Sequence, residues 1–381
     1  MRYNIDEDSY MKRGILSLSL LAVSILALNS CNAPIKIKSQ SGEYSIHSEH
    51  QELYLNDVNY NNITKHAAFA SLENYANSLP ITLSWSGGMS PYTLSISENE
   101  DLSNAYQVKV SKAKYDFYNP LIGKTYYWSV SHGDNVSEIA SFSVKDNKMR
   151  NITVDGVDNM RDIGGYSLSN GKKIKQGLIY RSAEFNKNNE AKLTLNITKA
   201  GLEMAKRLNI KTDIDLRRNY DKDDKIETSG IASSPLGSDI KYVQAPMHYG
   251  GENFLDNSDA TIDAMNKASI KLVFETIADS NNYPIVFHCV QGKDRTGCIA
   301  YLLEGLLGMK EDDIYRDYLF TNFSNSVGSA CKTDDIDRRY GMTIKAVEGE
   351  TLSNKVYKYL NENLGVDNSK LDAIIANLVM D

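Results

Sequence analysis

The residues best suited to chemistry lie between Pro284 and Gly297, in the segment PIVFHCVQGKDRTG. Cys289 follows a short apolar run, and Arg295 comes shortly after it. A thiolate is a strong nucleophile, and a guanidinium can bind two oxygens of one phosphate. Gly292 allows the loop to curl so that its amides point inward around an anion. The segment therefore predicts an activated cysteine beside a site for a tetrahedral oxyanion.

The loop is expected to join a strand to a helix. Residues 284–288 form the short, β-branched run of a buried strand, and residues 297–308 carry the apolar pattern of a helix. A helix N-terminus attracts anions and favours the thiolate form of a neighbouring cysteine. We expect Thr296 to hydrogen-bond the sulfur of Cys289. The residues expected to bind the phosphate are Val290, Gln291, Gly292, Lys293, Thr296 and Gly297.

The elements around this loop follow the alternating pattern of an α/β domain, predicted to span 148–381. Further strands are expected at 177–182, 210–217 and 240–246. Helices are expected at 199–208, 259–280, 352–365 and 369–379, with Asp259 as an N-cap. Ligands of such sheets bind beyond the carboxyl ends of the strands, which is where the cysteine loop would lie.

The motif His288–Gly297 resembles the HCxxGKDRTG signature of a bacterial and fungal tyrosine phosphatase family within the Cys-x5-Arg phosphatases. The segments NMRDIGGY (159–166), GLIYRSAEF (177–185) and DIDLRR (213–218) are similar to further motifs of that family, and the resemblance covers about 150–381. It implies that Cys289 forms a thiophosphate intermediate and that Arg295 and the loop amides stabilise the transferring phosphoryl group. The implied substrates are phosphorylated proteins. Lys293 makes phosphoinositides or inositol phosphates the alternative.

The general acid that protonates the leaving oxygen is not fixed by the pattern. The resemblance implies Asp294 first and Asp215 second. The loop after Pro246 offers further carboxylates at Glu252, Asp256 and Asp259. Structural roles for these acids are N-capping or, for Asp215, pairing with Arg217 or Arg161.

Three competing interpretations use the same residues. Cys289 could be an inert buried thiol, or the loop could bind anions in a protein without catalysis. A zinc site built from His288, Cys289, His248 and Cys331 is disfavoured, because adjacent ligands seldom share one tetrahedral metal. His288 is expected instead to hydrogen-bond backbone, and Cys298 to pack in the core. No metal or other cofactor is predicted.

The N-terminal segment resembles the signal peptide of a bacterial lipoprotein. Lys12 and Arg13 precede an apolar run that ends at Leu28-Asn-Ser-Cys31, similar to a lipobox. The acidic residues 1–10 suit this segment poorly, so translation is expected to start at Met11. The resemblance implies that residues 1–31 are an export signal, that Cys31 carries the lipid and that the protein is anchored to a membrane of the bacterial envelope. Residues 32–49 are expected to be a flexible tether.

Residues 50–147 are predicted to form an all-β sandwich, because short alternating segments are separated by turns. Their pattern resembles a fibronectin type III or related Ig-like module, which makes the chain multidomain. Trp85, Tyr127 and Trp128 are interpreted as core residues, with a sugar-binding platform as the alternative. No catalytic cluster is visible in this region, so a spacer or protein-contact module is expected.

The composition bounds the class of partner. The chain has 381 residues, a formal net charge of −7 and a sequence pI of about 5.5. Nucleic-acid binding is therefore not expected, because it calls for a basic footprint. Any anion site must be a local basic pocket. The 4 cysteines show neither a disulfide framework nor paired metal-ligand spacing.

Overall fold

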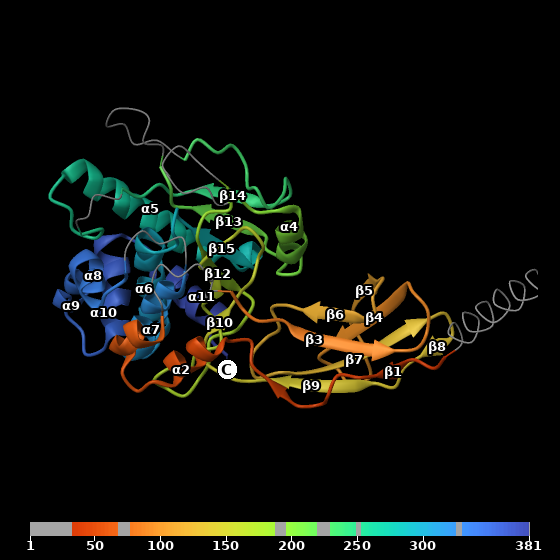
Figure 1. Ribbon diagram of the computed structural model, residues 1–381. Helices are drawn as coiled ribbons and strands as arrows, with labels where there is room; N and C mark the ends of the chain where they lie inside the picture. Colours follow the sequence, from red (N-terminus) through yellow and green to blue (C-terminus); the bar gives the residue numbers. More distant parts are fainter. Residues whose placement is uncertain are drawn as a thin grey trace, which may run out of the picture. The chain divides into compact units, whose positions relative to one another are not determined.

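The computed structural model describes residues 33–67, 77–186, 196–218, 229–248, 253–324 and 330–380, which form two compact units. The larger unit comprises 45–79, 118–123 and 145–381. Its sheet has the order β10-β11-β12-β15-β13-β14 (Figure 1). The strands are β10 (Arg150–Asn151), β11 (Arg161–Asp162), β12 (Ile179–Ser182), β13 (Thr212–Asp215), β14 (Lys241–Gln244) and β15 (Ile285–His288).

The strand that precedes the cysteine loop, β15, lies between β12 and β13 and runs parallel to both. The register pairs His288 with Ser182 on one side and with Asp215 on the other. These three strands therefore end at one edge of the sheet, and the cysteine loop begins at that edge. The predicted α/β sheet is confirmed in the larger unit, with each predicted strand shortened by one to four residues.

The helices of the larger unit enclose the sheet from both faces. They are α2 (Glu49–Asn56), α3 (Ile63–His66), α4 (Lys199–Lys206), α5 (Ala260–Ala278), α6 (Asp294–Leu307), α7 (Glu311–Phe320), α8 (Thr333–Ile336), α9 (Met342–Ala346), α10 (Leu352–Lys358) and α11 (Asn368–Leu378). Two π-helical segments, η4 (Asp337–Gly341) and η5 (Tyr359–Asn363), interrupt the later helices. Short 3-10 turns are η1 (Tyr60–Asn62), η2 (Ser280–Asn282) and η3 (Thr321–Phe323).

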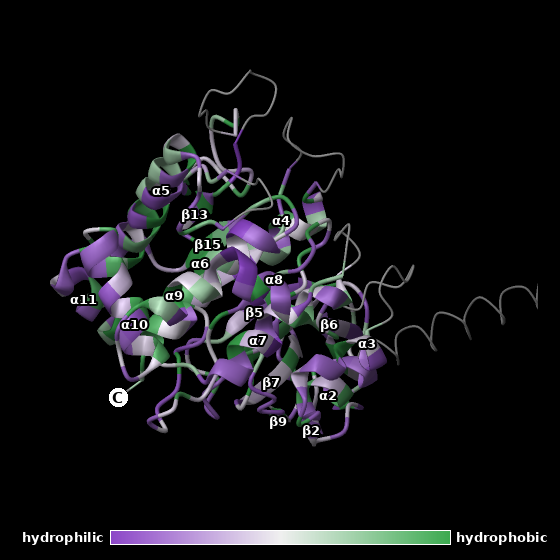
Figure 2. Cartoon of the chain, turned by 90° about the vertical axis from the view of Figure 1, so that its left-hand side faces the viewer, coloured by the Kyte–Doolittle hydropathy of each residue, from purple (hydrophilic) through white to green (hydrophobic). Residues whose placement is uncertain are grey.

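Alternation along β15 divides the core of this unit between two faces of the sheet. Ile285 and Phe287 belong to the large cluster that includes the helices α5 and α6, whereas Val286 belongs to a smaller cluster with Ala205 of α4. Every residue of α6 is buried, which explains why its sequence is mainly apolar after the first turn. In Figure 2 the strand β15 is coloured mainly as hydrophobic, and the short helix α8 is mainly hydrophilic.

The smaller unit comprises two β-sheets. One contains β1 (Lys36–Ile37), β3 (Ile81–Ser86) and β6 (Lys114–Phe117). The other contains β2 (Glu43–Tyr44), β9 (Ala140–Val144), β7 (Thr125–His132), β4 (Tyr92–Ser97) and β5 (Tyr106–Val110), with β8 (Asn135–Val136) beside β7. The rings of Trp85 in one sheet and Trp128 in the other lie 6.4 Å apart, and both side chains are buried. The prediction that these two tryptophans are core residues is confirmed, whereas Tyr127 is half-buried.

The chain is divided differently from the predicted boundaries. Residues 36–37 and 43–44, predicted to lie in a flexible tether, pair as strands β1 and β2. Residues 45–79, most of them predicted to be sandwich, belong to the larger unit. There α2 begins with a capping box between Ser48 and Gln51. Arg316 of α7 donates to the carbonyls of Tyr54 and Asp57, so these hydrogen bonds hold the end of α2 on the larger unit.

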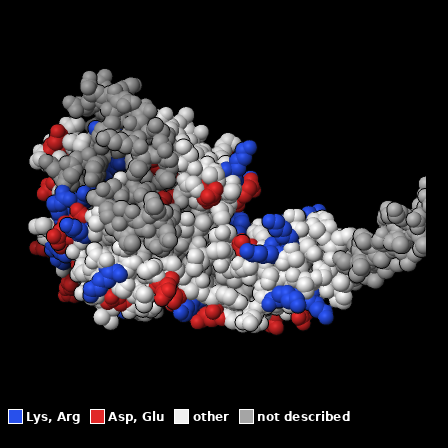
Figure 3. Space-filling model, in the orientation of Figure 1, with Lys and Arg blue, Asp and Glu red and all other residues white. Residues whose placement is uncertain are grey.

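Charges of both signs are mixed on the described surface shown in Figure 3. Within the described ranges, no helix combines the length and the apolar composition needed to cross a membrane. Cys31 and the rest of the proposed lipoprotein signal lie outside the described residues.

Candidate active site

The cysteine loop occupies the turn between β15 and α6. Helix α6 begins at Asp294, three residues earlier than predicted, so that Arg295 and Thr296 lie in its first turn. The first amides of a helix have no partner within the helix, so an anion at the start of α6 can accept hydrogen bonds from this turn. Cys289, Lys293 and Arg295 are buried, whereas Val290 and Gln291 are partly exposed. The sequence placed all seven residues from Cys289 to Arg295 at the site. Six were predicted from their position in the loop, and the seventh, Asp294, from the family resemblance.

Two of the predicted phosphate ligands have different environments. The amide of Gly297 donates to the carbonyl of Lys293 at 2.8 Å, so it is used by the helix and not offered to a ligand. A Cβ on Gly297 would lie 3.1 Å from the ring of Tyr318, which indicates that this glycine allows close packing. The hydroxyl of Thr296 is buried and has no hydrogen-bond partner among the described residues, so the predicted bond to the sulfur is not formed. An unpaired buried hydroxyl next to the loop is consistent with a ligand that supplies the partner.

Two separate features of the loop require a glycine at position 292. Its φ of +65° lies in the left-handed region that favours glycine. A Cβ there would also lie 2.6 Å from the backbone carbon and oxygen of Ser182, at the end of β12. The loop thus turns tightly against the neighbouring strand.

The carbonyl oxygens of the loop are held from the side of β11 and β12. The amide nitrogen of Asn159 donates to the carbonyls of Gln291 at 3.0 Å and Gly292 at 3.2 Å. Arg181 donates to the carbonyl of Gly292 at 3.0 Å. Within one planar peptide unit the N–H points opposite to the C=O, so the amides of Gly292 and Lys293 point away from Asn159 and Arg181. The segments NMRD and YRS therefore orient the loop for an anion on its other side.

A buried carboxylate, Asp317 of α7, fixes the two arginines of those segments. The Nε of Arg161 donates to Asp317 Oδ1 at 2.7 Å, and Arg181 forms an ion pair with Asp317 Oδ2. Arg161 also donates to the side-chain oxygen of Asn159 at 2.6 Å. Burial raises the pKa of Asp317, but the charges of Arg161 and Arg181 outweigh it and lower the pKa overall. Asp317 therefore remains a carboxylate.

Glu304 of α6 adjoins this network and, unlike Asp317, is protonated. Its pKa is raised well above the ordinary value, first by burial and then by the negative charge of Asp317, to which it is hydrogen-bonded. Glu304 is thus a neutral acid that donates to Asp317. Neither Asp317 nor Glu304 was predicted as a supporting residue, because neither belongs to a motif of the sequence.

His288, immediately before Cys289, is held by one aspartate and by a backbone carbonyl. Its Nε2 lies 3.1 Å from Oδ1 of Asp213, and its Nδ1 lies 3.3 Å from the carbonyl oxygen of Cys289. The predicted contact between this ring and the backbone is confirmed. Burial lowers the pKa of His288, but Asp215 and Asp213 raise it by more. The imidazole is consequently favoured in its charged form beside Cys289.

Asp215 is a poor candidate for the general acid. Its carboxylate accepts hydrogen bonds from the Nε of Arg217 at 2.9 Å, from Arg217 Nη2 at 2.8 Å and from the hydroxyl of Tyr242 at 2.7 Å. Burial raises its pKa, but the charges of His288 and Arg217 and these hydrogen bonds lower it well below the usual range. An acid with a pKa that low has no proton to donate near neutral pH. The geometry favours the pairing of Asp215 with Arg217, while Arg161 pairs with Asp317.

Asp294 has the properties that a proton donor needs. It lies within the loop motif, and burial raises the pKa of its carboxyl against the charges of Arg339, Lys293 and Arg295. Oδ1 of Asp294 lies 2.5 Å from Nη1 of Arg339. A carboxyl group with a raised pKa can be protonated at the pH at which a thiolate attacks.

The other candidate acids are less well placed. Asp259 caps α5 by accepting from the amides of Thr261 at 2.8 Å and Ile262 at 3.2 Å, as the sequence predicted. Asp256 is exposed, and Glu252 lies outside the described residues.

The other two cysteines within the described ranges are buried thiols. Burial raises the pKa of Cys298 far above its ordinary value, which fits the predicted packing role. It raises the pKa of Cys331 to about 12. Among the described side chains, no group of three or more His, Cys, Asp or Glu is arranged to hold a metal ion, and this includes the set considered for zinc.

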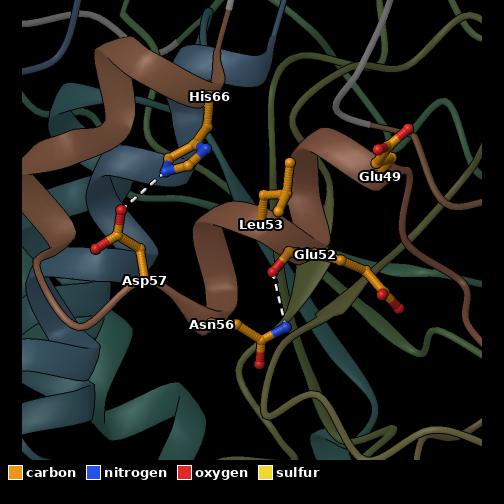
Figure 4. Close-up of a pocket in the computed structure, with 6 residues that line it drawn as sticks. All are labelled: Glu49, Glu52, Leu53, Asn56, Asp57 and His66. Atoms are coloured by element: carbon orange, nitrogen blue, oxygen red, sulfur yellow. Dashed lines mark hydrogen bonds and ion pairs between the residues drawn. The ribbon is translucent and has the colours of Figure 1, made fainter.

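A surface cavity of about 420 Å³ lies over α2 and α3 and contains no residue of the cysteine loop (Figure 4). Two of its three acidic side chains form ion pairs: Asp57 pairs with His66 at 2.9 Å, and Glu52 pairs with Lys145 at 3.3 Å. We assign it no part in the site. Its lining consists of Glu49, Glu52, Leu53, Asn56, Asp57 and His66.

Comparison with known proteins identifies the class of the larger unit. The profile of the tyrosine phosphatase family matches residues 152–380, more than half of the chain, and the chain belongs to that family. A putative tyrosine-protein phosphatase of Cupriavidus necator is 28% identical over 191 residues, covering 46% of this chain and 64% of its own length. A tyrosine-protein phosphatase of Nostoc commune is 31% identical over 134 residues, covering 32% of this chain and 44% of its own length. The alignments thus span less than two thirds of these relatives.

Two solved structures are also similar. The core catalytic domain of the PP-IP phosphatase SIW14 of S. cerevisiae has 16% identity and a TM-score of 0.30, covering 50% of this chain and 91% of its own. TpbA of P. aeruginosa has 16% identity and a TM-score of 0.27, covering 54% of this chain and 88% of its own.

Proposed function

We propose that this protein is a cysteine-dependent phosphomonoester hydrolase that acts on phosphotyrosine in proteins. The observation that carries the proposal is the loop between Cys289 and Arg295. Its carbonyls are held by Asn159 and Arg181, and the first turn of α6 places helix N-terminal amides next to a buried guanidinium. Such a site fits a phosphoryl group and places a thiol beside it. Membership of the tyrosine phosphatase family supports the same activity.

The reaction has two displacements at phosphorus. The sulfur of Cys289 attacks and forms an S–P bond, while the P–O bond to the leaving group breaks and Asp294 gives that oxygen a proton. Water then attacks the phosphorus and gives a proton to Asp294, while the S–P bond breaks and releases phosphate and the thiolate of Cys289. In both steps charge develops on the phosphoryl oxygens, where Arg295 and the loop amides stabilise it. His288⁺ favours the thiolate that begins the cycle.

Phosphoinositides or inositol phosphates are the second candidate substrates. Lys293 is buried in the loop beside Arg295, and a second cation there suits a substrate that carries more than one phosphate. In a tyrosine phosphatase Lys293 would only raise the local positive potential.

Substrate preference and mechanism can be tested together. We expect kcat/KM for a phosphotyrosine peptide to exceed that for soluble phosphoinositides by at least about tenfold. Acid quenching during turnover of ³²P-labelled peptide is expected to leave the label on Cys289 as an acid-stable thiophosphate, located by peptide mapping. Faster turnover of phosphoinositides would favour the second candidate. Phosphate binding without turnover of either substrate would favour a non-catalytic anion-binding protein.

The smaller unit is proposed to be a fibronectin type III-like or related Ig-like module that serves as a spacer or protein contact. Two mainly antiparallel sheets with tryptophans between them support that proposal. Binding of a partner by the isolated catalytic unit as strongly as by the whole chain would argue against a contact role.

The export signal is likewise a proposal, and it rests on the sequence around Cys31. We expect the protein to fractionate with bacterial membranes and to incorporate labelled palmitate. A Cys31→Ser variant is expected to lose the label and at least about 90% of its membrane association, because a lipid anchor depends on buried CH₂ groups. Unchanged membrane association in this variant would indicate that an uncleaved apolar segment, and not a lipid, is the anchor.

A further inference from the structure

An arginine far from the cysteine motif contacts the proposed acid. Arg339 lies in the π-helical segment η4, between α8 and α9. Its Nη1 is 2.5 Å from Oδ1 of Asp294, and the exposed fractions of the two side chains are only 6% and 11%. An ion pair so shielded from water is stronger than one on the surface. π-Helical turns of this kind occur frequently at functional sites.

The backbone around Arg339 is fixed on two sides. The carbonyl oxygen of Arg339 accepts a hydrogen bond from the amide of Phe254 at 2.7 Å. The neighbouring Tyr340 is buried, and its ring centroid lies 5.0 Å from that of Tyr301 in α6. The backbone that carries the guanidinium is therefore held in place relative to α6, the helix that begins with Asp294.

We infer that Arg339 is the positioning residue for Asp294: its guanidinium holds the carboxyl in the orientation from which it passes a proton to the leaving oxygen. This inference rests on the proposed function of the loop. It adds a residue that belongs to no motif of the sequence and lies 45 positions beyond the acid.

The charges around Asp294 define what Arg339 contributes. Burial is the main influence and raises the pKa of Asp294, and Arg339 is the strongest of the cations that oppose it. The other titratable groups that face Asp294 are Lys293 and Arg295 from the loop and α6, Asp335 from α8, Tyr318 from α7, Tyr340 from η4, and Cys331. Of these, Lys293 and Arg295 lower the pKa, and Asp335 raises it.

The charge of Arg339 determines how kcat/KM depends on pH. Asp294 acts as an acid only while protonated, so kcat/KM falls as the pH rises through its pKa. Removing the positive charge of Arg339 raises that pKa. The high-pH limb of the profile should then move to higher pH, while the maximal rate falls because the carboxyl is no longer held in one orientation.

The experiment compares pH profiles of kcat/KM for an aryl phosphate with a poor leaving group, using the full chain. In Arg339→Gln the high-pH limb is expected to move up by about one unit, the order of shift that a close charge produces. Arg339→Lys, which keeps the charge, is expected to leave the limb near its wild-type position. The control is Arg338→Gln: that side chain is 52% exposed and pairs with Asp335, and its profile should stay unchanged.

A purely structural role for Arg339 would lower the rate of Arg339→Gln at every pH without moving the limb, and that result would overturn the inference. A double-mutant cycle gives a second criterion. Asp294→Asn is expected to lose activity on the order of 10²-fold. Adding Arg339→Gln to it should cost little more, whereas independent, additive losses would contradict the inference.

A direct titration does not depend on turnover. In ¹³C-labelled protein the Asp294 carboxyl signal, assigned with Asp294→Asn, is expected to titrate at higher pH in Arg339→Gln than in wild type. An unchanged midpoint would overturn the inference even if the protein hydrolyses phosphate esters. A shifted midpoint in a protein without any hydrolysis would support the contact and reject the proposed function.

Discussion

Cys289→Ser is expected to lose aryl-phosphate hydrolysis on the order of 10⁴-fold or more, the scale seen when a catalytic nucleophile is removed. The reason is the proton on the attacking atom. The sulfur of Cys289 lies before the N-terminus of α6 and next to His288, and such positions favour the nucleophilic thiolate form of a cysteine. A serine hydroxyl at the same place would need a base to remove its proton, and Asp215 is already saturated with hydrogen bonds.

The same variant should still bind phosphate. The loop amides and Arg295 are unchanged by the substitution, so calorimetry is expected to give a Kd for phosphate near that of wild type. Vanadate is expected to bind more weakly than to wild type, because it bonds to the sulfur that the variant lacks. The matched control is Cys298→Ala, nine residues along the chain on a buried face of α6. It should lose about 1 kcal/mol of stability and little activity. Hydrolysis that survives Cys289→Ser would rule out the covalent mechanism.

Local motifs predicted the chemistry of the site because its central residues are contiguous. A strand, a turn with Gly292 and a helix start lie within one stretch, and each has a recognisable local signal. The helix start was placed three residues late, because Asp294, Arg295 and Thr296 look like loop residues by polarity alone. Their polar side chains are buried in the structure, and the apolar pattern that marks the helix begins only at Gly297.

The supporting residues could not be predicted, because they are brought to the loop by tertiary packing. Asp317 and Arg339 lie on helices after α6 and form their ion pairs across the core of the unit. A charged residue on a helix is normally interpreted as solvent-exposed, and only its burial distinguishes these two. The helix α2 was missed for a different reason: the signal Ser48-x-x-Gln51 was present, but it was outweighed by the β pattern of the residues that follow.

The second large effect is expected for Asp317→Asn. The substitution leaves Arg161 and Arg181 as two buried cations without their shared carboxylate. Breaking a buried ion pair in this way typically costs about 3–5 kcal/mol. Because the two arginines hold Asn159 and the carbonyl of Gly292, the loop should lose its orientation as well. We expect a lower urea midpoint together with a loss of kcat/KM on the order of 10²-fold.

Glu304→Gln is the matched control, since a glutamine amide can replace the neutral carboxyl as a donor to Asp317. In the folded protein Glu304 binds its proton more tightly than in the unfolded chain, for which the ordinary pKa is 4.5. Wild-type stability should therefore fall as the pH rises above that value, by up to about 1.4 kcal/mol per pH unit. Glu304→Gln cannot ionise, so this part of the pH dependence should disappear while activity is retained. Urea denaturation of both proteins between pH 5 and 8 checks the difference. If the free energy of unfolding had the same pH dependence in both proteins, Glu304 would be ionised beside Asp317. The network would then carry one more negative charge than we infer.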